Sequence, residues 1–494
     1  MSYTEKALKG FTIVFVINVI AAFLGYLIRV VLARNLTVAE YGLFFSVFTL
    51  VSFLGVFIGF GTGDSLVKFI PEFLVKKNYG RIKNAVIIVF LLTVATIFAF
   101  GAALLAFSGF FAKYYFKNPL AAPVLLLFII IMFVSNLKSI LRWVFQAFQD
   151  MKLYSLMYLL ENSFLLALLI GFFAFKKDVF AASYAYIAAY LLVLIIFLPA
   201  VLKLIGFFRH KTLLKKELSQ KLLRFGIPLM ISSIGGIIIV YTDTLVLTFF
   251  RSMEEVGIYN VVVPTAMILQ FFATSIATVI FPMVAELWAK KKQDYLGSGL
   301  KMIYTYSFMI MIPAVFIAFS FSKTILRLMF GENYIGGAVT MQILLVGIIF
   351  LGLHSITSTI LNGIGKPVIS TRILLEGALI NLALNLLLIP FLGMIGAAIT
   401  SLIAYAYVAV RCIFKLRHFI HVEIPWIGWL KTILAGMLML GLIFFLKGII
   451  FLNVYIEGII CAAAGGLFYI VLVFVLRIVD LKEVKELVRY ITAR

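Results

Sequence analysis

Long apolar segments are the feature that most constrains how this chain can fold. Apolar residues recur in blocks of about 20 or more, the length that a helix needs to cross about 30 Å of hydrocarbon. The strands of a transmembrane β-barrel alternate apolar and polar residues, whereas these blocks are continuously apolar. Helices are the other structure that satisfies all backbone hydrogen bonds in lipid, so the blocks are predicted to be helices. Of the 494 residues, 64% are hydrophobic and 13% are charged, which excludes a water-soluble globular protein. The sequence therefore predicts an all-α, polytopic membrane protein.

Fourteen segments are predicted to cross the membrane. They cover residues 10–33, 42–63, 84–108, 119–141, 154–175, 179–202, 226–250, 257–283, 300–322, 336–361, 368–391, 394–414, 428–450 and 455–476. After the last span, apolar residues of the segment 480–494 recur on one helical face, which predicts an amphipathic tail on the inner membrane surface.

The positive charge is distributed unevenly between the segments that connect these spans. Of the 42 Lys and Arg residues, 32 lie in segments on the same side as the N-terminus and nine on the other. Cytoplasmic loops are enriched in basic residues, so both termini are predicted to be cytoplasmic. The membrane is expected to be the plasma (inner) membrane. The net charge of +22 is thus explained by the orientation of the protein in the membrane. Anionic lipids are the expected partners of the basic cytoplasmic segments. Nucleic acid is excluded as a partner because the sequence has no soluble basic domain.

Sequence motifs for metals, cofactors and ATP are absent. Cys412 and Cys461 are far apart, and the four His residues have no metal-ligand spacing. The segment Gly363–Pro367 lacks the spacing of a P-loop. We therefore expect no metal site, no cofactor and no ATP-driven step in this chain.

An internal repeat indicates how the spans are organised. At an offset of 215–216 residues, Glu40–Phe44 aligns with Glu255–Tyr259, and similar matches continue across six spans. The repeat predicts two six-helix lobes in parallel orientation, residues 1–205 and 222–416, joined by a basic cytoplasmic connector at 206–221 and followed by a helix pair at 428–476. Two homologous bundles favour transport of a solute or lipid by alternating access, with a channel or a structural bundle as the alternatives.

Charged residues inside the predicted spans are candidates for function, because a charge at bilayer depth is costly. Arg29 lies in the first span, although it could simply extend to the outer membrane face. Asp243 lies in the seventh span within a polar run that includes Tyr241 and Thr244. At the repeat offset Asp243 aligns with the residue before Arg29, so the two could face each other as a gate, a substrate clamp or a structural lock.

Further candidates lie in both predicted lobes. Lys138 and Arg142 are four residues apart and share one helix face, where they line a cavity or anchor the membrane interface. Glu161 and Glu376 align at the repeat offset and are candidates for proton or cation coupling, or for structural hydrogen bonding. His354 is an intramembrane imidazole that serves a proton relay or packing.

Three motifs resemble a known family. The segments are Arg29–Phe44, Tyr241–Asn260 and Leu361–Pro367, and they resemble the corresponding loops and helices of Wzx-type oligosaccharide-lipid flippases, within the multidrug, oligosaccharidyl-lipid and polysaccharide exporter superfamily. The resemblance implies a secondary transporter, not an enzyme. Such a flippase moves an oligosaccharide on polyprenyl or dolichyl (pyro)phosphate from the inner to the outer leaflet for cell-surface polysaccharide or glycan assembly. It also implies a cationic cavity in the N-terminal lobe, with Arg29, Arg142 and Lys138 as candidates.

Two other functions remain open at the level of sequence. A cation-coupled multidrug and toxin extruder is the main alternative: the first span carries Arg29 where some extruders have a carboxylate, but Asp243 and Glu376 could bind a cation. A scaffold in envelope assembly is the third. The flippase is expected to act as a monomer, and its basic tails could dock a glycosyltransferase or polymerase. Membrane potential, protons and sodium are all open as the energy source.

Overall fold

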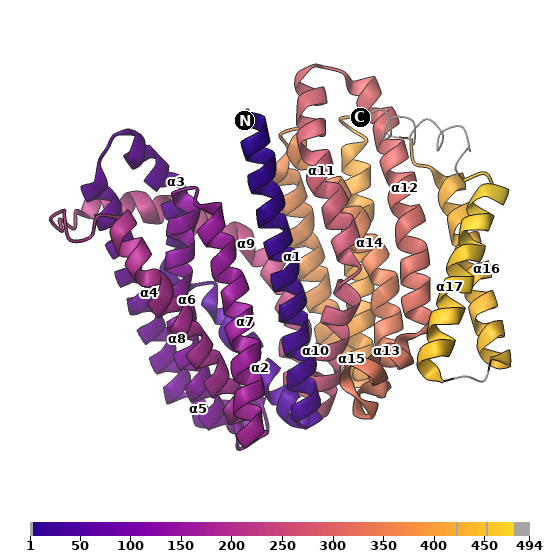
Figure 1. The fold of residues 1–494 in the computed structure, drawn as a ribbon, viewed down its shortest axis with the longest axis horizontal. Helices are drawn as coiled ribbons and strands as arrows, with labels where there is room; N and C mark the ends of the chain where they lie inside the picture. Colours follow the sequence, from indigo (N-terminus) through magenta and orange to yellow (C-terminus); the bar gives the residue numbers. More distant parts are fainter. Residues whose placement is uncertain (1–2, 421–422, 451–452, 479–494) are drawn as a thin grey trace. The chain divides into compact units, whose positions relative to one another are not determined.

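The computed structural model describes residues 3–420, 423–450 and 453–478, and within these ranges the regular structure is entirely helical (Figure 1). This confirms the predicted all-α fold class. The helices are α1 (Tyr3–Asn35), α2 (Val38–Gly55), η1 (Ile58–Gly61), α3 (Thr62–Val75), α4 (Tyr79–Ala106), α5 (Ser108–Phe110), η2 (Phe111–Tyr115), α6 (Ala121–Ala147), α7 (Met151–Phe175), α8 (Val179–Leu204), α9 (Lys216–Phe250), α10 (Met253–Met267), α11 (Gln270–Ala289), α12 (Gln293–Ser320), α13 (Ser322–Phe330), η3 (Glu332–Gly337), α14 (Ala338–Gly363), α15 (Pro367–Leu416), α16 (Trp426–Ile449) and α17 (Val454–Val475). The predicted amphipathic tail at 480–494 lies outside the described residues.

Among the described residues, thirteen helices are long and apolar enough to cross a membrane. The difference from the fourteen predicted spans comes from α15, whose 50 residues include the predicted spans 368–391 and 394–414. The chain turns between these two halves at Gly393, where φ is 56° and ψ is −136°. Glycine tolerates this left-handed backbone because it has no Cβ, so α15 is two spans joined without a loop.

Two other predicted spans are interrupted. The span predicted at 42–63 ends at Gly55, and the backbone has positive φ at Gly59, Phe60 and Gly61 before α3 begins. The span predicted at 257–283 is divided between α10 and α11. Both interruptions lie inside apolar sequence, so hydropathy alone does not predict that the helix ends there.

Polar side chains cap several of the helices. Thr37 and Glu40 form a reciprocal capping box at the start of α2, which satisfies backbone N–H groups that have no partner within the helix. Asn78, Asp150, Asp178 and Asn453 accept backbone hydrogen bonds in the same way at the starts of α4, α7, α8 and α17. These caps explain why the helices begin where they do.

The chain forms two compact units, Met1–Val261 and Val262–Arg494. In the first unit, α6 packs against α2, α3, α4 and α8, while α1 packs along α7. In the second, α14 packs against α11, α12 and α15, and α16 packs against α12 and α17. The predicted lobes 1–205 and 222–416 stay a prediction, because a division by packing does not test a sequence repeat.

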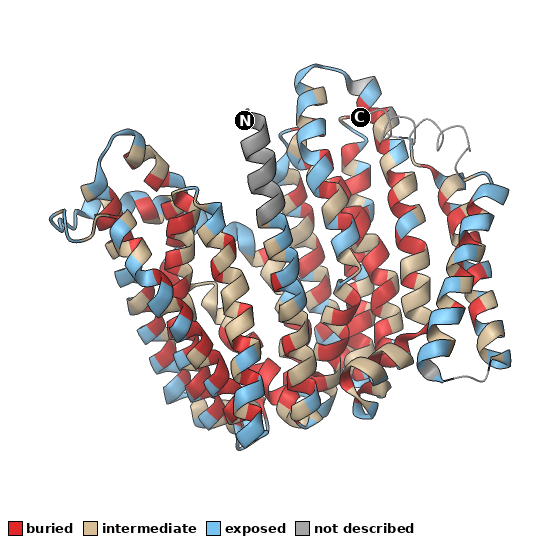
Figure 2. Cartoon of the chain, viewed as in Figure 1, coloured by how far each residue is buried: buried red, intermediate tan, exposed pale blue. Residues whose placement is uncertain are grey.

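Buried and exposed residues alternate along the helices of each unit (Figure 2). Many of the exposed residues are large and apolar. Leu192 and Ile195 on α8 and Phe391 on α15 are examples of exposed apolar residues. In a water-soluble protein such surfaces are rare, whereas lipid tails solvate them at no cost.

Within the first unit, α2 and α10 cross at two glycines. A Cβ added at Gly42 would collide with the backbone of Met253 and Gly257, and one added at Gly257 would collide with the backbone of Val38. The two glycines are equivalent positions in the sequence repeat. Their backbones therefore touch directly at the crossing.

Candidate functional site

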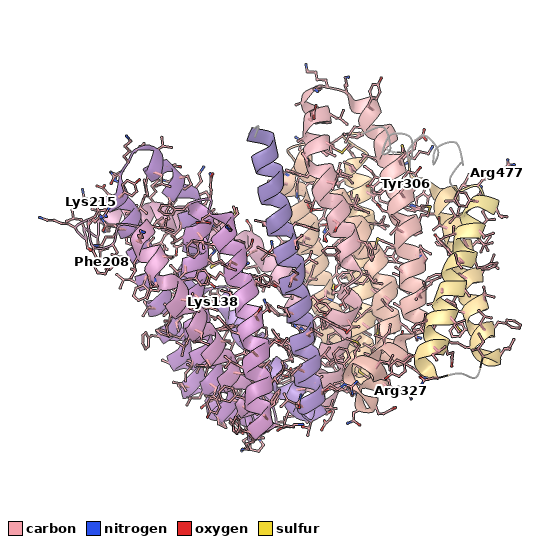
Figure 3. All side chains as sticks on the ribbon, in the orientation of Figure 1. Lys138, Phe208, Lys215, Tyr306, Arg327 and Arg477 are labelled. Carbon is pink, nitrogen blue, oxygen red and sulfur yellow. The ribbon has the colours of Figure 1, made fainter. Side chains whose placement is uncertain are left out.

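A buried cluster of charged and aromatic residues lies between α6, α7 and α8 in the first unit. Lys138 forms an ion pair with Glu161, and the side chains are only 7% and 13% exposed. The Lys138 ammonium also lies 3.8 Å from the centre of the Tyr190 ring, close enough for a cation–π contact. Figure 3 shows Lys138 within the first unit.

Arg142 lies one helical turn beyond Lys138 on α6. Its guanidinium is 4.6 Å from the centre of the Tyr154 ring and 5.1 Å from that of Tyr158, and Nη2 donates to the Tyr154 hydroxyl at 3.2 Å. Its Nε is buried and has no hydrogen-bond partner among the described residues. A guanidinium donates five hydrogen bonds, so Arg142 keeps capacity for an anionic ligand.

Local sequence explains why these groups meet. Residues four apart share one helix face, which places Lys138 and Arg142 together on α6 and Tyr154 and Tyr158 together on α7. The chain reverses between the two helices at Gln149, where φ is 59°, and Asp150 caps α7. The short connection makes α6 and α7 antiparallel neighbours.

Arg29 lies elsewhere in the same unit, on α1. Its guanidinium is 4.6 Å from the centre of the Phe45 ring of α2, and Nη1 donates to the carbonyl of Asn260 on α10 at 3.4 Å. The side chain is therefore held between three helices.

Asp243 is 5% exposed and accepts a hydrogen bond of 2.6 Å from the Tyr259 hydroxyl. Arg29 and Asp243 thus contact adjacent residues of α10. Thr244 is buried beside Asp243, and its carbonyl accepts from Thr248, while Tyr241 is partly exposed. The direct pairing of Arg29 with Asp243 stays a prediction.

The second unit holds the remaining two candidates. Glu376 accepts a hydrogen bond from Tyr407 at 2.9 Å and lies 3.4 Å from Arg372 and 3.7 Å from Arg411. His354 is buried on α14, with Nδ1 3.5 Å from the Cys412 sulfur. Glu161 and Glu376, equivalent in the repeat, therefore each face basic side chains. In the described part of the chain, no three His, Cys, Asp or Glu side chains are grouped so that they could hold a metal ion.

The aromatic partners of the cations were not among the predicted site residues. Tyr154, Tyr158 and Tyr190 contact the two cations of α6. The first two are four residues apart and precede Glu161 by seven and three residues, so the helical period could have placed them on the same face.

Comparison with known proteins is consistent with a transporter. Residues 7–288 match the family model described as polysaccharide biosynthesis protein, and residues 228–387 match the MatE model. The chain is 31% identical to an uncharacterized membrane protein of Methanocaldococcus jannaschii over the full length of both chains. It is 26% identical to the probable low-salt glycan biosynthesis flippase Agl15 of Haloferax volcanii, over 58% of this chain and 61% of that one. Its fold is similar to a structure of the lipid II flippase MurJ in the inward closed conformation, with a TM-score of 0.78, 15% identity and coverage of 94% of this chain and 99% of that chain.

Proposed function

The chain belongs to the family of polysaccharide biosynthesis proteins, and on this premise we propose that it is a flippase for an oligosaccharide linked to polyprenyl or dolichyl phosphate or pyrophosphate. It is a multi-pass membrane transporter and not an enzyme. The flippase would move its substrate from the inner to the outer leaflet for assembly of a cell-surface polysaccharide or glycan.

The observation that carries the proposal is the pair of cations on α6, of which Lys138 is buried and Arg142 is partly buried. Lys138 and Arg142 lie among tyrosine rings within a candidate membrane span, and Arg142 has an unsatisfied donor. Cations at this depth are costly and are usually retained for a ligand. A guanidinium matches the geometry of a phosphate, which it can bind through two parallel hydrogen bonds.

The mechanism that we propose is alternating access. The phosphate binds Arg142 and Lys138 from the cytoplasmic leaflet, the glycan crosses in a polar path, and the lipid tail stays in the bilayer. The proposed orientation has both termini in the cytoplasm of the plasma membrane. Membrane potential, or a gradient of protons or sodium acting on Glu161, Glu376 or His354, would supply the energy. A glycosyltransferase or polymerase could bind the basic cytoplasmic segments.

Reconstitution tests the proposed function. Purified protein in liposomes is given a fluorescent dolichyl phosphate-linked oligosaccharide, and its movement between leaflets is followed by quenching of the dye in the outer leaflet. Arg142→Ala removes charge-assisted hydrogen bonds of about 1.5–3 kcal/mol, so we expect about 10–100-fold slower flipping. Arg142→Lys keeps the positive charge but lacks the planar guanidinium. Its flipping rate should therefore lie between those of wild type and Arg142→Ala.

The exposed Arg81 at the start of α4 supplies the control, since Arg81→Ala removes an equal charge outside the cluster and should flip at the wild-type rate. Wild-type protein that does not move the lipid-linked sugar would contradict the proposal.

A cation-coupled multidrug extruder is the second candidate function, favoured by the match of residues 228–387 to the MatE model. In this alternative Glu376 or Asp243 would exchange a cation for a drug. Efflux of cationic dyes by the same liposomes, without movement of lipid-linked sugar, would favour the extruder.

A further inference from the structure

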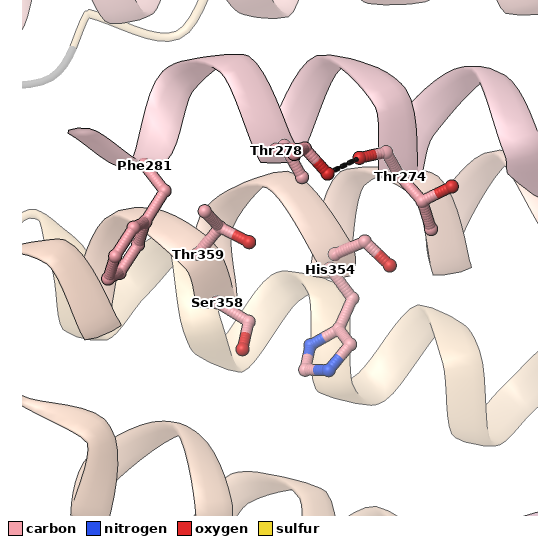
Figure 4. A pocket seen from close by; sticks show the side chains of 8 residues that line it. Thr274, Thr278, Phe281, His354, Ser358 and Thr359 are labelled. Carbon is pink, nitrogen blue, oxygen red and sulfur yellow. Dashed lines mark hydrogen bonds between the residues drawn. The ribbon is translucent and has the colours of Figure 1, made fainter. Parts of the chain in front are cut away.

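A polar groove lies between α11 and α14 in the second unit. Its volume is about 520 Å³, within the range of about 300–1,000 Å³ that is typical of small-molecule sites. Figure 4 shows that hydroxyl-bearing side chains of both helices line it. The lining residues are Thr274, Ala277, Thr278, Phe281, His354, Ser355, Ser358 and Thr359. We call this cavity the hydroxyl groove.

The threonines of α11 present oxygen acceptors to the groove. Thr278 donates its hydroxyl proton to the carbonyl of Thr274 at 2.8 Å, as the dashed line in Figure 4 shows, and Thr274 donates to the carbonyl of Phe271 at 3.1 Å. Each hydroxyl has one proton and two lone pairs. Because the protons are used within α11, the lone pairs remain for a ligand that donates hydrogen bonds.

An amide behind the groove holds one of its lining hydroxyls. Gln270 lies one turn before Thr274, and its Nε2 donates to Ser355 at 2.7 Å, which fixes the orientation of the amide. Its Oε1 is buried and finds no donor among the residues that the structure describes. A buried polar atom without a partner costs about 1–3 kcal/mol, but Gln270 is not among the lining residues, so its role beside the groove is to orient Ser355.

The hydroxyls are not explained as contacts that hold the two helices together. Helix pairs in membranes use Ser and Thr for hydrogen bonds across the interface. Here the hydrogen bonds of Thr274 and Thr278 run along α11. The bonds that cross to α14 come from Gln270, which donates to the Ser355 hydroxyl and to the carbonyl of Leu351.

The lining indicates the class of ligand. It contains no Asp, Glu, Lys or Arg, so it does not match a phosphate. His354 is buried and contributes a polar imidazole to the lining of the groove. The exposed ring of Phe281 contributes an apolar surface at one end of the groove. Several acceptors beside an aromatic ring suit a neutral sugar, whose hydroxyls donate while its C–H face packs on the ring.

We propose that the hydroxyl groove binds sugar residues of the transported glycan. The inference rests on the proposed function and adds to it a site for the glycan that is distinct from the cations on α6. The phosphate and the sugar would then be recognised by different residues.

Binding to purified protein in detergent tests the groove. Native mass spectrometry measures the affinity for two probes: dolichyl phosphate, and dolichyl phosphate that carries a tetrasaccharide. We expect wild-type protein to bind the glycan-bearing lipid at least about tenfold more tightly, which corresponds to about 1.4 kcal/mol. The double variant Thr274→Val/Thr278→Val keeps side-chain shape but loses both acceptors, so it should lose this preference and bind dolichyl phosphate as wild type does.

Thr305→Val is the matched control, since the Thr305 hydroxyl also donates along its own helix, to Lys301 on α12, but lies outside the groove. Wild type that binds both probes equally, a double variant with the wild-type preference, or a double variant that loses both probes equally would each overturn the groove proposal. Wild type that binds neither probe would instead contradict the proposed function. A second variant, Thr359→Val, tests the α14 side and should reduce the preference without changing the thermal stability.

Discussion

At the scale of single residues, the ion pair of Lys138 and Glu161 dominates the energetics of the candidate site. Both side chains are almost fully buried, so neither charge is solvated by water. Burying an ion pair gains little net stability, but removing one partner leaves the other charge uncompensated. The pair therefore holds Lys138 in place, and the loss of hydration that burial imposes on this ammonium would be partly offset by a bound phosphate.

We expect Glu161→Gln to destabilise the protein by about 3–5 kcal/mol, because it leaves Lys138 buried without its counter-charge. The double variant Lys138→Met/Glu161→Leu, which replaces both charges by apolar groups, should recover most of that loss. Thermal unfolding in detergent measures both changes. A double variant that unfolds as early as Glu161→Gln would show that the loss has another origin.

The sequence predicts part of this site and misses the rest for a physical reason. The four-residue spacing of Lys138 and Arg142 places them on one helix face without any structure. Their contacts with Tyr190 and Tyr154 depend on the register between helices, which the helical period of one segment does not contain. The sequence makes Glu161 a candidate for ion coupling or for structural hydrogen bonding, but it does not identify Lys138 as its partner.

At the scale of elements, Asp178 is a helix cap whose effect depends on pH. It accepts a hydrogen bond from the N–H of Ala181 at 2.8 Å at the start of α8. Partial burial opposes ionisation, but hydrogen bonds from Lys176 and from backbone N–H groups outweigh it and lower the pKa of the Asp178 carboxyl below its usual 3.8. A lowered pKa stabilises the fold above the unfolded-state value, and this contribution is lost as the pH falls through the folded-state pKa.

Asp178→Ala should therefore cost about 1 kcal/mol of stability at neutral pH, and the difference from wild type should shrink below pH 3.8. Asp178→Asn keeps the capping oxygen without the charge, so it should lie between the two at neutral pH and show little pH dependence. Thermal unfolding at several pH values measures this. A difference between wild type and Asp178→Ala that is constant with pH would contradict the role of the charge.

Span positions follow from hydropathy, but breaks within spans do not. Pro390 and Gly393 lie between two predicted spans, and the structure joins them into α15 with a turn at Gly393. Breaks at 58–61 and between α10 and α11 occur within apolar sequence. Hydropathy measures affinity for lipid, whereas a break depends on backbone dihedral angles and on neighbours.

At the scale of the whole molecule, the asymmetry of basic residues makes a prediction about orientation. Cys412 and Cys461 are both buried, so single cysteines placed at exposed sites can be labelled selectively. A cysteine at Lys177, between α7 and α8, should react with a membrane-impermeant maleimide in intact cells. A cysteine at Lys291, between α11 and α12, should react only after permeabilisation. The reverse pattern would invert the proposed orientation.

The crossing of α2 and α10 has a consequence for how closely these two helices can approach. Most helix pairs meet through side chains, whereas Gly42 and Gly257 bring two bare backbones together. A Cβ at Gly42 would lie 1.9 Å from the carbonyl oxygen of Met253, and one at Gly257 would lie 2.3 Å from that of Val38. A larger residue at either position would therefore force α2 and α10 apart, so this crossing is a point at which the first unit has no room for a side chain.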